Sequence, residues 1–169
     1  MSVTENLLEY NRGYAERFAQ GGRPAEPARG VAVVTCMDAR VHPESLLGLE
    51  LGDAHVLRNA GGRVTDDVLR SLIISAHVLG TREYLVIHHT RCGMLGATND
   101  ALRARVAAAT GADASGIDFL PFDDMDDSVR DDVQLIRASP HLPADATVSG
   151  YVYDVDTGAL SAVSGRNRE

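Results

Sequence analysis

Two short apolar runs constrain this chain most, because each one leads into residues that bind metal. Residues 31–35 read VAVVT and residues 84–88 read YLVIH. Runs of this length and composition are typical of buried strands in a parallel sheet. Cys36 follows the first run, His89 follows the second, and Cys92 comes three residues later. The only two thiols of the chain and one imidazole therefore lie at the exits of two expected strands.

This set of side chains predicts a metal site. Two thiolates and an imidazole are three of the four ligands that tetrahedral Zn²⁺ takes, and a catalytic site keeps its fourth position for water. We therefore expect Cys36, His89 and Cys92 to hold a catalytic Zn²⁺. A Cys-x-x-Cys redox pair is absent, and a phosphatase-type Cys-x5-Arg loop would need arginine where the chain has His42 and Thr98. Two buried, inert cysteines are the alternative.

Asp38 and Arg40 stand in the loop that follows Cys36. Two residues from an expected ligand, Asp38 is close enough to lie beside the metal, and Arg40 is placed to hold its carboxylate. We expect Asp38 to accept a hydrogen bond from the reacting water and Arg40 to keep that carboxylate ionised. An ordinary ion pair of a loop is the other interpretation.

The rest of the chain alternates between strand and helix patterns. Further strands are expected at residues 54–58, 147–155 and 159–163, and helices at about 66–79, 97–109 and 126–138. This order predicts an α/β fold with a mainly parallel central sheet of four to five strands and helices on both faces. Ligands of such sheets bind beyond the carboxyl ends of the strands, which is where the expected zinc ligands lie.

Residues 1–20 form a separate feature. Ser2 and Glu5 fit a capping box, and Leu7, Tyr10 and Tyr14 recur at helical spacing before Gly21. A linker follows the glycine, so this helix is either an arm that packs on another subunit or a part of the chain's own core.

Length and charge narrow the class of protein. A chain of 169 residues fits one domain, here 1–169, with a core that needs no disulfide. The net charge of −8 and the acidic stretch at 123–132 make nucleic acid an unexpected partner, and we interpret that stretch as a solubilising surface. The sequence shows neither a signal peptide nor an apolar run of membrane-spanning length, so we expect a cytoplasmic protein with no membrane partner.

The segment CMDARVHPESLLGLELGDAHVLRNAGG, followed by VIHHTRCGM, resembles the β class of carbonic anhydrases, in particular their short bacterial and archaeal members. The resemblance implies an enzyme that reversibly hydrates CO₂ to bicarbonate by a zinc-bound hydroxide. It implies Cys36, His89 and Cys92 as the zinc ligands and Asp38 with Arg40 as the dyad beside the fourth position. It also implies a homodimer or homotetramer in which the N-terminal helix reaches across.

Two other functions remain open on the same residues. Some relatives hydrolyse CS₂ or COS on this scaffold, and the motifs do not reveal the pocket that would select those substrates. A non-catalytic protein that zinc stabilises, and that binds anions or partners, would also keep the three ligands. An intact Asp38 and Arg40 argue against that last function, because a purely structural site does without them.

Overall fold

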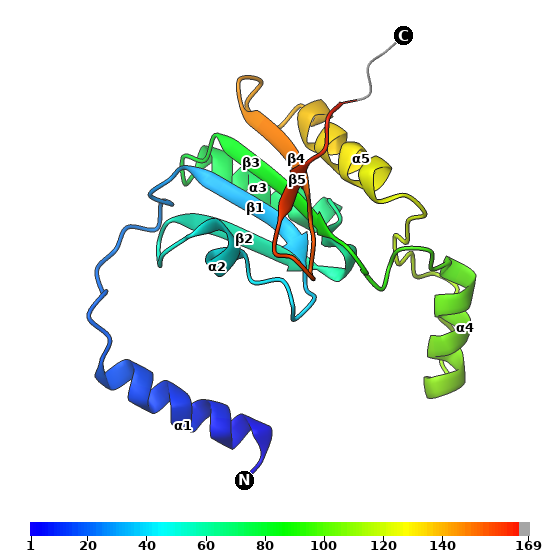
Figure 1. Ribbon diagram of the computed structural model, residues 1–169, viewed down its shortest axis with the longest axis horizontal. Coiled ribbons are helices and arrows are strands. Elements are labelled where there is room, and N and C mark those ends of the chain that lie inside the picture. The colour runs from blue at the N-terminus through cyan, green and yellow to red at the C-terminus, as the bar shows by residue number, and fades with distance from the viewer. Residues whose placement is uncertain (166–169) are drawn as a thin grey trace.

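The computed structural model describes residues 1–165 and contains a five-stranded sheet in the order β2-β1-β3-β4-β5. Its strands are β1 (Val31–Cys36), β2 (Ala54–Asn59), β3 (Glu83–His89), β4 (Thr147–Tyr153) and β5 (Leu160–Ala162). The first four run parallel, and β5 pairs antiparallel with β4 at the edge (Figure 1). The expected α/β fold with a mainly parallel sheet is confirmed.

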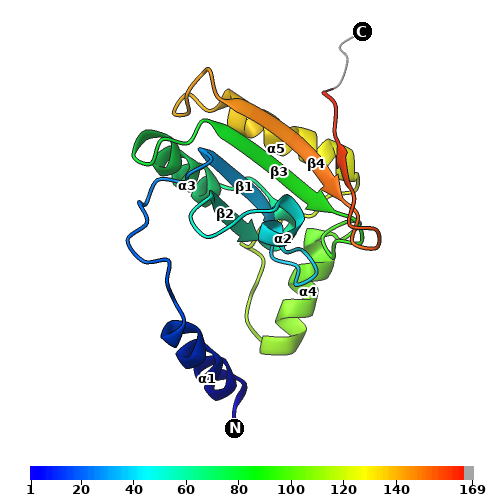
Figure 2. The same ribbon diagram turned by 60° about the vertical axis from the view of Figure 1, so that its left-hand side comes forward.

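The helices of the body cover the sheet unequally. The helical elements are α1 (Val3–Glu16), α2 (Pro43–Leu47), the 3-10 turn η1 (Ala60–Gly62), α3 (Asp66–His77), α4 (Asn99–Thr110) and α5 (Met125–Ala138). Figures 1 and 2 show α3 and α5 behind the sheet and the short α2 on the opposite side. Ser2 and Glu5 form the expected capping box of α1, and the Thr65 side chain caps α3.

The core lies between α3, α5 and one face of the sheet. Alternate residues of a strand point to the same face, and the core residues of β1 and β3 follow this period. Apolar side chains of α3, α5, β1, β3 and β4 form most of the cluster, including Ala32, Val34, Leu72, Tyr84, Val86, Val129, Ile136 and Val148. Gly150 allows α5 to pack directly on β4, because a Cβ at this position would collide with side-chain carbons of Val129 and Val133. This close packing of α3 and α5 on the sheet fixes the positions of the strands and therefore of the residues at their ends.

Two helices, α1 and α4, project from this body, and neither contains a buried residue (Figure 1). α1 is exposed along its length, and an extended segment joins it to β1 (Figure 1). It ends at Glu16, four residues earlier than the sequence pattern indicates. Its apolar side chains, among them Leu7 and Tyr10, are 64% and 76% exposed. The alternative in which this helix packs in its own core is therefore wrong, and the helix is an arm in this chain.

Some boundaries differ from the sequence-based expectation by one or two residues. β4 ends at Tyr153, because the turn that follows is closed by hydrogen bonds to Asp154, whose backbone N–H donates to Ala159 O and whose carbonyl accepts from Gly158 N. β5 is shorter than residues 159–163. Across residues 1–165, the apolar helix length that a bilayer span requires is not reached by any helix.

Candidate metal centre at the carboxyl ends of two strands

The carboxyl ends of β1 and β3 bring together the donor atoms of Cys36, His89 and Cys92. These two strands are hydrogen-bonded neighbours, with Cys36 as the last residue of β1 and His89 as the last residue of β3. Both sulfurs and an imidazole nitrogen lie within 4.8 Å of one another, and all three residues are buried. Strand order reverses between β1 and β3, which is where ligands bind in open parallel sheets.

Local backbone geometry brings Cys92 back towards the strand ends. Arg91 adopts the left-handed conformation, with φ of 55°, which is uncommon for a residue other than glycine. The turn reverses the chain after β3, and the Arg91 carbonyl accepts a hydrogen bond of 3.1 Å from Arg40. The loop after β3, which carries Cys92, is thereby joined directly to the loop that follows Cys36.

A hydrogen bond fixes the orientation of the His89 ring. Nδ1 lies 2.9 Å from the Thr90 carbonyl oxygen, so this nitrogen carries the proton and donates it. Nε2 is then the acceptor nitrogen, and it is buried without an oxygen or nitrogen hydrogen-bond partner among residues 1–165. When the imidazole is neutral, this tautomer places the lone pair of Nε2 beside the two sulfurs.

Asp38 and Arg40 form a bidentate pair at the mouth of the cluster. Arg40 Nε lies 2.9 Å from Oδ1 and Arg40 Nη2 lies 2.7 Å from Oδ2, while the Arg40 backbone N–H also donates to Oδ1 at 2.9 Å. These hydrogen bonds hold the pKa of the Asp38 carboxyl well below its usual range. Oδ2 is 3.8 Å from His89 Nε2. The carboxylate is therefore ionised and lies next to the three clustered donor atoms.

The two thiols differ in their acidity. A hydrogen bond from Cys92, assisted by His89, lowers the pKa of Cys36 to about 4 in spite of its burial. The same hydrogen bond and burial raise the pKa of Cys92. Burial lowers the pKa of His89, but the interaction with Cys36 outweighs it, and the net pKa is raised. Cys36 is therefore the more acidic of the two thiols, and the thiolate is the form of cysteine that binds metal.

Arg58 supports the loop that carries these residues. Its Nε donates to the Cys36 carbonyl at 3.0 Å and its Nη2 donates to the Asp38 carbonyl at 2.8 Å. The Met37 backbone N–H donates to the carbonyl of Asn59 at 2.8 Å. The end of β2 is thereby fixed to the loop after β1. The motif spacing does not single out Arg58.

The first histidine of the HHT motif, His88, lies outside the cluster. His88 points to the other face of β3, where its Nε2 lies 3.1 Å from Asp132 of α5. Adjacent strand residues point to opposite faces, so His88 and His89 lie on opposite sides of β3. The interpretation of residues 123–132 as a solubilising surface is wrong for Asp132, which is fully buried.

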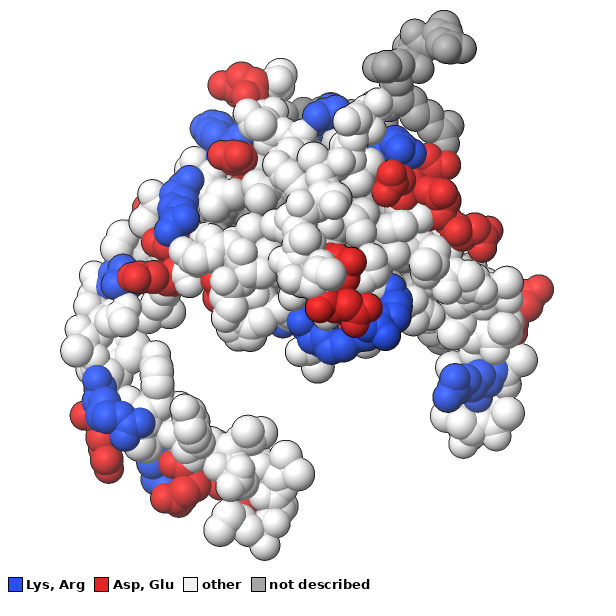
Figure 3. Space-filling model, in the orientation of Figure 1, with Lys and Arg blue, Asp and Glu red and all other residues white. Residues whose placement is uncertain are grey.

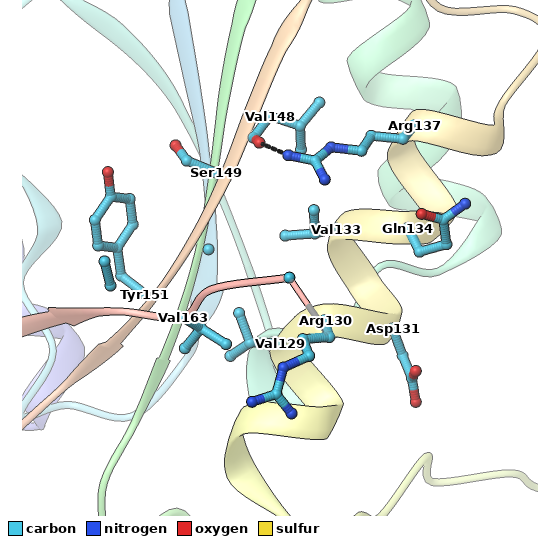
Figure 4. Close-up of a pocket in the computed structure, with 13 residues that line it drawn as sticks. Val129, Arg130, Asp131, Val133, Gln134, Arg137, Val148, Ser149, Tyr151 and Val163 are labelled. Atoms are coloured by element: carbon cyan, nitrogen blue, oxygen red, sulfur yellow. Dashed lines mark hydrogen bonds between the residues drawn. The ribbon is translucent and has the colours of Figure 1, made fainter. Parts of the chain in front are cut away.

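A large cavity elsewhere contains none of these residues. A cavity of about 600 Å³ lies between α5, β4 and the segment after β5, and its wall includes Val129, Val133, Val148 and Val163 (Figure 4). Arg137 from α5 lies across this cavity and donates to the carbonyl of Val148. Size alone therefore does not locate the metal-binding group.

Comparison with known proteins agrees with this geometry. Residues 31–117 match the family model described as carbonic anhydrase. The chain is 41% identical over 166 residues to beta-carbonic anhydrase 1 of Mycobacterium tuberculosis, covering 97% of this chain and 99% of the relative. The chain belongs to the β-carbonic anhydrase family. Members of this family are metalloenzymes and lyases (carbonate dehydratases), so the family expectation from the motifs is confirmed.

One solved structure and one further relative are also similar to this β-carbonic anhydrase chain. The crystal structure of carbonic anhydrase from Streptococcus mutans superposes with a TM-score of 0.93 at 48% identity, covering 97% of this chain and 99% of that one. A carbon disulfide hydrolase of an Acidianus strain is 35% identical over 156 residues, covering 78% of this chain and 76% of the relative. Two enzyme activities therefore occur among its relatives.

Proposed function

We propose that this chain is a zinc enzyme that interconverts CO₂ and bicarbonate. The observation that carries the proposal is the convergence of three buried donor atoms, from Cys36, His89 and Cys92, within 4.8 Å beside the Asp38 carboxylate. The relative that spans 97% of the chain is a carbonic anhydrase by name, and this supports the same activity.

The donor set fits zinc better than other common ions. Thiolate sulfur is a soft ligand that Mg²⁺ and Ca²⁺ do not favour, whereas two thiolates with an imidazole suit Zn²⁺. The buried Nε2 of His89 lacks an oxygen or nitrogen partner within residues 1–165, and a buried nitrogen of this kind is costly unless something binds it. Cys36, His89 and Cys92 would therefore hold the ion and leave a fourth position open.

When bound, zinc supplies a Lewis acid that makes water acidic enough to act as a nucleophile near neutral pH. Asp38 orients the nucleophile. A carboxylate has about four lone-pair sites, and Arg40 occupies two on Oδ1 and one on Oδ2. The remaining site of Oδ2 accepts a hydrogen bond from the attacking water, which directs the lone pair of its oxygen at the carbon of CO₂.

Apolar side chains form the other wall of the site. Phe122 is buried against Cys36 and Cys92, and Met94 and Met125 pack against the same cluster. CO₂ carries no charge and no hydrogen-bond donor, so an apolar wall accepts it without loss of hydrogen bonds. The charged dyad on one side and the apolar wall on the other suit the conversion of an apolar substrate to an anion.

A carbon disulfide hydrolase is the second candidate function. Its support is the relative from Acidianus, which matches 78% of the chain. CS₂ is also linear and apolar, so the wall formed by Phe122 and Met94 does not discriminate against it. Release of H₂S from CS₂ by the purified protein, at a rate above that of CO₂ hydration, would favour this activity.

The zinc content and CO₂ hydration of the native protein and of Asp38→Asn test the main proposal. We expect one zinc per chain in both proteins, and a hydration rate at least about 100-fold lower in Asp38→Asn, because the amide neither pairs with Arg40 as an anion nor orients the water. Asp145→Asn, an exposed change just before the amino end of β4 and so at the far end of the strands, is the matched control. Full activity in Asp38→Asn would contradict the role of Asp38 in orienting the water. Native protein that binds zinc but does not hydrate CO₂ at any pH would favour a non-catalytic binding protein.

We also propose that the chain works as a homodimer or homotetramer. α1 projects from the body with its apolar residues exposed, including Val3, Leu7 and Tyr14 (Figure 1). An amphipathic helix without a core to pack on is stabilised by burying that face against another subunit. On the face shown in Figure 3, basic and acidic side chains are interspersed over the body, whereas the free end of the α1 arm is largely uncharged.

A further inference from the structure

Asp132 is the centre of a buried polar group behind the metal-binding cluster. The side chain lies on α5 and is 0% exposed. Its Oδ2 accepts from Arg63 Nε at 2.8 Å and from His88 Nε2 at 3.1 Å, and its Oδ1 accepts from the Val64 backbone N–H at 3.1 Å. The Asp132 carboxylate therefore joins three parts of the fold: α5, the end of β3 and the segment that follows η1.

Phe122 connects this polar group to the cysteines. Its ring centroid lies 5.5 Å from that of His88, and the Arg63 guanidinium carbon lies 5.7 Å from the same centroid. The ring is 8% exposed and packs with Cys36 and Cys92 in one apolar cluster. Phe122 is therefore packed between the group centred on Asp132 and the two sulfurs.

The backbone of Phe122 is tied to the loop that carries Cys92. Its N–H donates to the Met94 carbonyl at 3.2 Å, and its carbonyl accepts from Gly96 N at 2.8 Å. Arg63 also donates to the Leu120 carbonyl at 3.3 Å. A shift of Arg63 would therefore reach the Cys92 loop both through the ring and through the chain segment before it.

We propose that Asp132 is a positioning residue that keeps the Cys36, His89 and Cys92 donors at the spacing needed for the metal. This role rests on the proposed zinc site, although Asp132 touches none of the three donors. A buried carboxylate with three donors cannot move without breaking hydrogen bonds that water does not replace. Asp132 thus fixes His88, the neighbour of the His89 ligand, from one side and Phe122, the wall of the sulfurs, from the other.

The charge of Asp132 is essential to this arrangement. Arg63 is only 14% exposed, so its guanidinium depends on that carboxylate for compensation. An amide in place of the carboxylate keeps the shape but leaves Arg63 without its counter-charge beneath the Phe122 ring. We expect the ring and the Cys92 loop to shift, and the metal geometry to change with them.

Asp132→Asn tests this role by a readout other than activity. Groups outside the ligand set change metal affinity by about 10- to 100-fold when they are removed, and we expect a loss in this range for zinc, measured by competition with a chromophoric chelator. The Co²⁺-substituted protein should also show a changed sulfur-to-cobalt absorption band. Asp131→Asn removes the same charge from an exposed position on the same helix, and should change neither measurement.

The outcomes separate this role from the proposed function. Native protein that binds neither zinc nor Co²⁺ would overturn both. Tight binding by the native protein, with the same affinity and the same cobalt spectrum in Asp132→Asn, would overturn the positioning role alone, even if thermal stability falls. If circular dichroism shows that Asp132→Asn does not fold, Arg63→Met decides, because it removes the other charge of the same ion pair, the one beneath Phe122. Unchanged affinity in a folded Arg63→Met would contradict the proposal.

Discussion

At the scale of single residues, Gly62 fits the loop after β2 against the strand that ends in Cys36. Its φ is +72°, and a Cβ added there would lie 2.9 Å from the Cys36 backbone nitrogen and 3.0 Å from the Thr35 carbonyl carbon. Both contacts are with backbone, which cannot rotate away. Only glycine therefore allows this approach between the loop and the base of the metal-binding cluster.

Gly62→Ala should consequently damage both stability and the site. The left-handed φ and the overlap together predict a loss of about 2 kcal/mol or more in the free energy of unfolding, measured by urea denaturation. Zinc affinity should fall as well, because Cys36 must shift. Gly116→Ala is the control, since its Cβ meets nothing within 4 Å and its φ is ordinary. Equal stability of the two variants would refute this account of Gly62.

The candidate ligands are also the residues that the sequence predicts best. Cys36 and His89 follow apolar runs that form neighbouring strands, so period and position were enough to bring them together. Asp132 was missed, although its helical spacing from Val129 and Ile136 places it on the inward face of α5 and could have indicated burial. Phe122 carried no such signal, because its contacts with the cysteines depend on the path of an irregular segment.

At the scale of elements, the Asp118 carboxylate joins the start of α4 to the segment between α4 and α5. Asp118 Oδ1 accepts from the Leu120 backbone N–H at 2.9 Å and from Asn99 Nδ2 at 2.8 Å. These hydrogen bonds lower the pKa of Asp118. A lowered pKa in the folded state contributes stability above the unfolded pKa of about 3.9, and this contribution is lost as pH falls through the folded value.

The contact between α4 and this segment should therefore loosen in acid. We expect the Leu120 amide to exchange hydrogen faster as pH falls below about 4, after correction for intrinsic exchange rates. Asp118→Ala should show the fast exchange already at neutral pH and lose this dependence on acid. Protection of Leu120 that is the same in both proteins across this range would contradict the assignment.

Element types and order follow from the sequence, and element ends follow less well. Capping residues such as Thr65 mark the starts of helices, because the signal is local. The end of α1 at Glu16 was not predicted, since Tyr14 and Phe18 continue the helical spacing, and their rings lie 5.4 Å apart without a helix that includes both. No contact between α1 and the body of residues 31–165 marks this end in the sequence pattern, because α1 buries none of its residues.

At the scale of the whole molecule, the exposed apolar face of α1 predicts self-association. Leu7→Asp combined with Tyr14→Asp places two charges on that face, and we expect a lower molar mass by light scattering after size-exclusion chromatography. Arg12→Asp, on the opposite face of the helix, should leave the mass of the native assembly unchanged. A native protein that is already monomeric at micromolar concentration would contradict the proposed assembly.

The central claim is that two sulfurs and one imidazole hold a single zinc at the ends of β1 and β3. X-ray absorption at the zinc edge of the metal-loaded protein measures this most directly. We predict two sulfur neighbours at about 2.3 Å and a nitrogen of imidazole at about 2.0–2.1 Å, with room for one light atom. Only nitrogen and oxygen neighbours around the zinc, or a protein that takes up no zinc, would contradict the account.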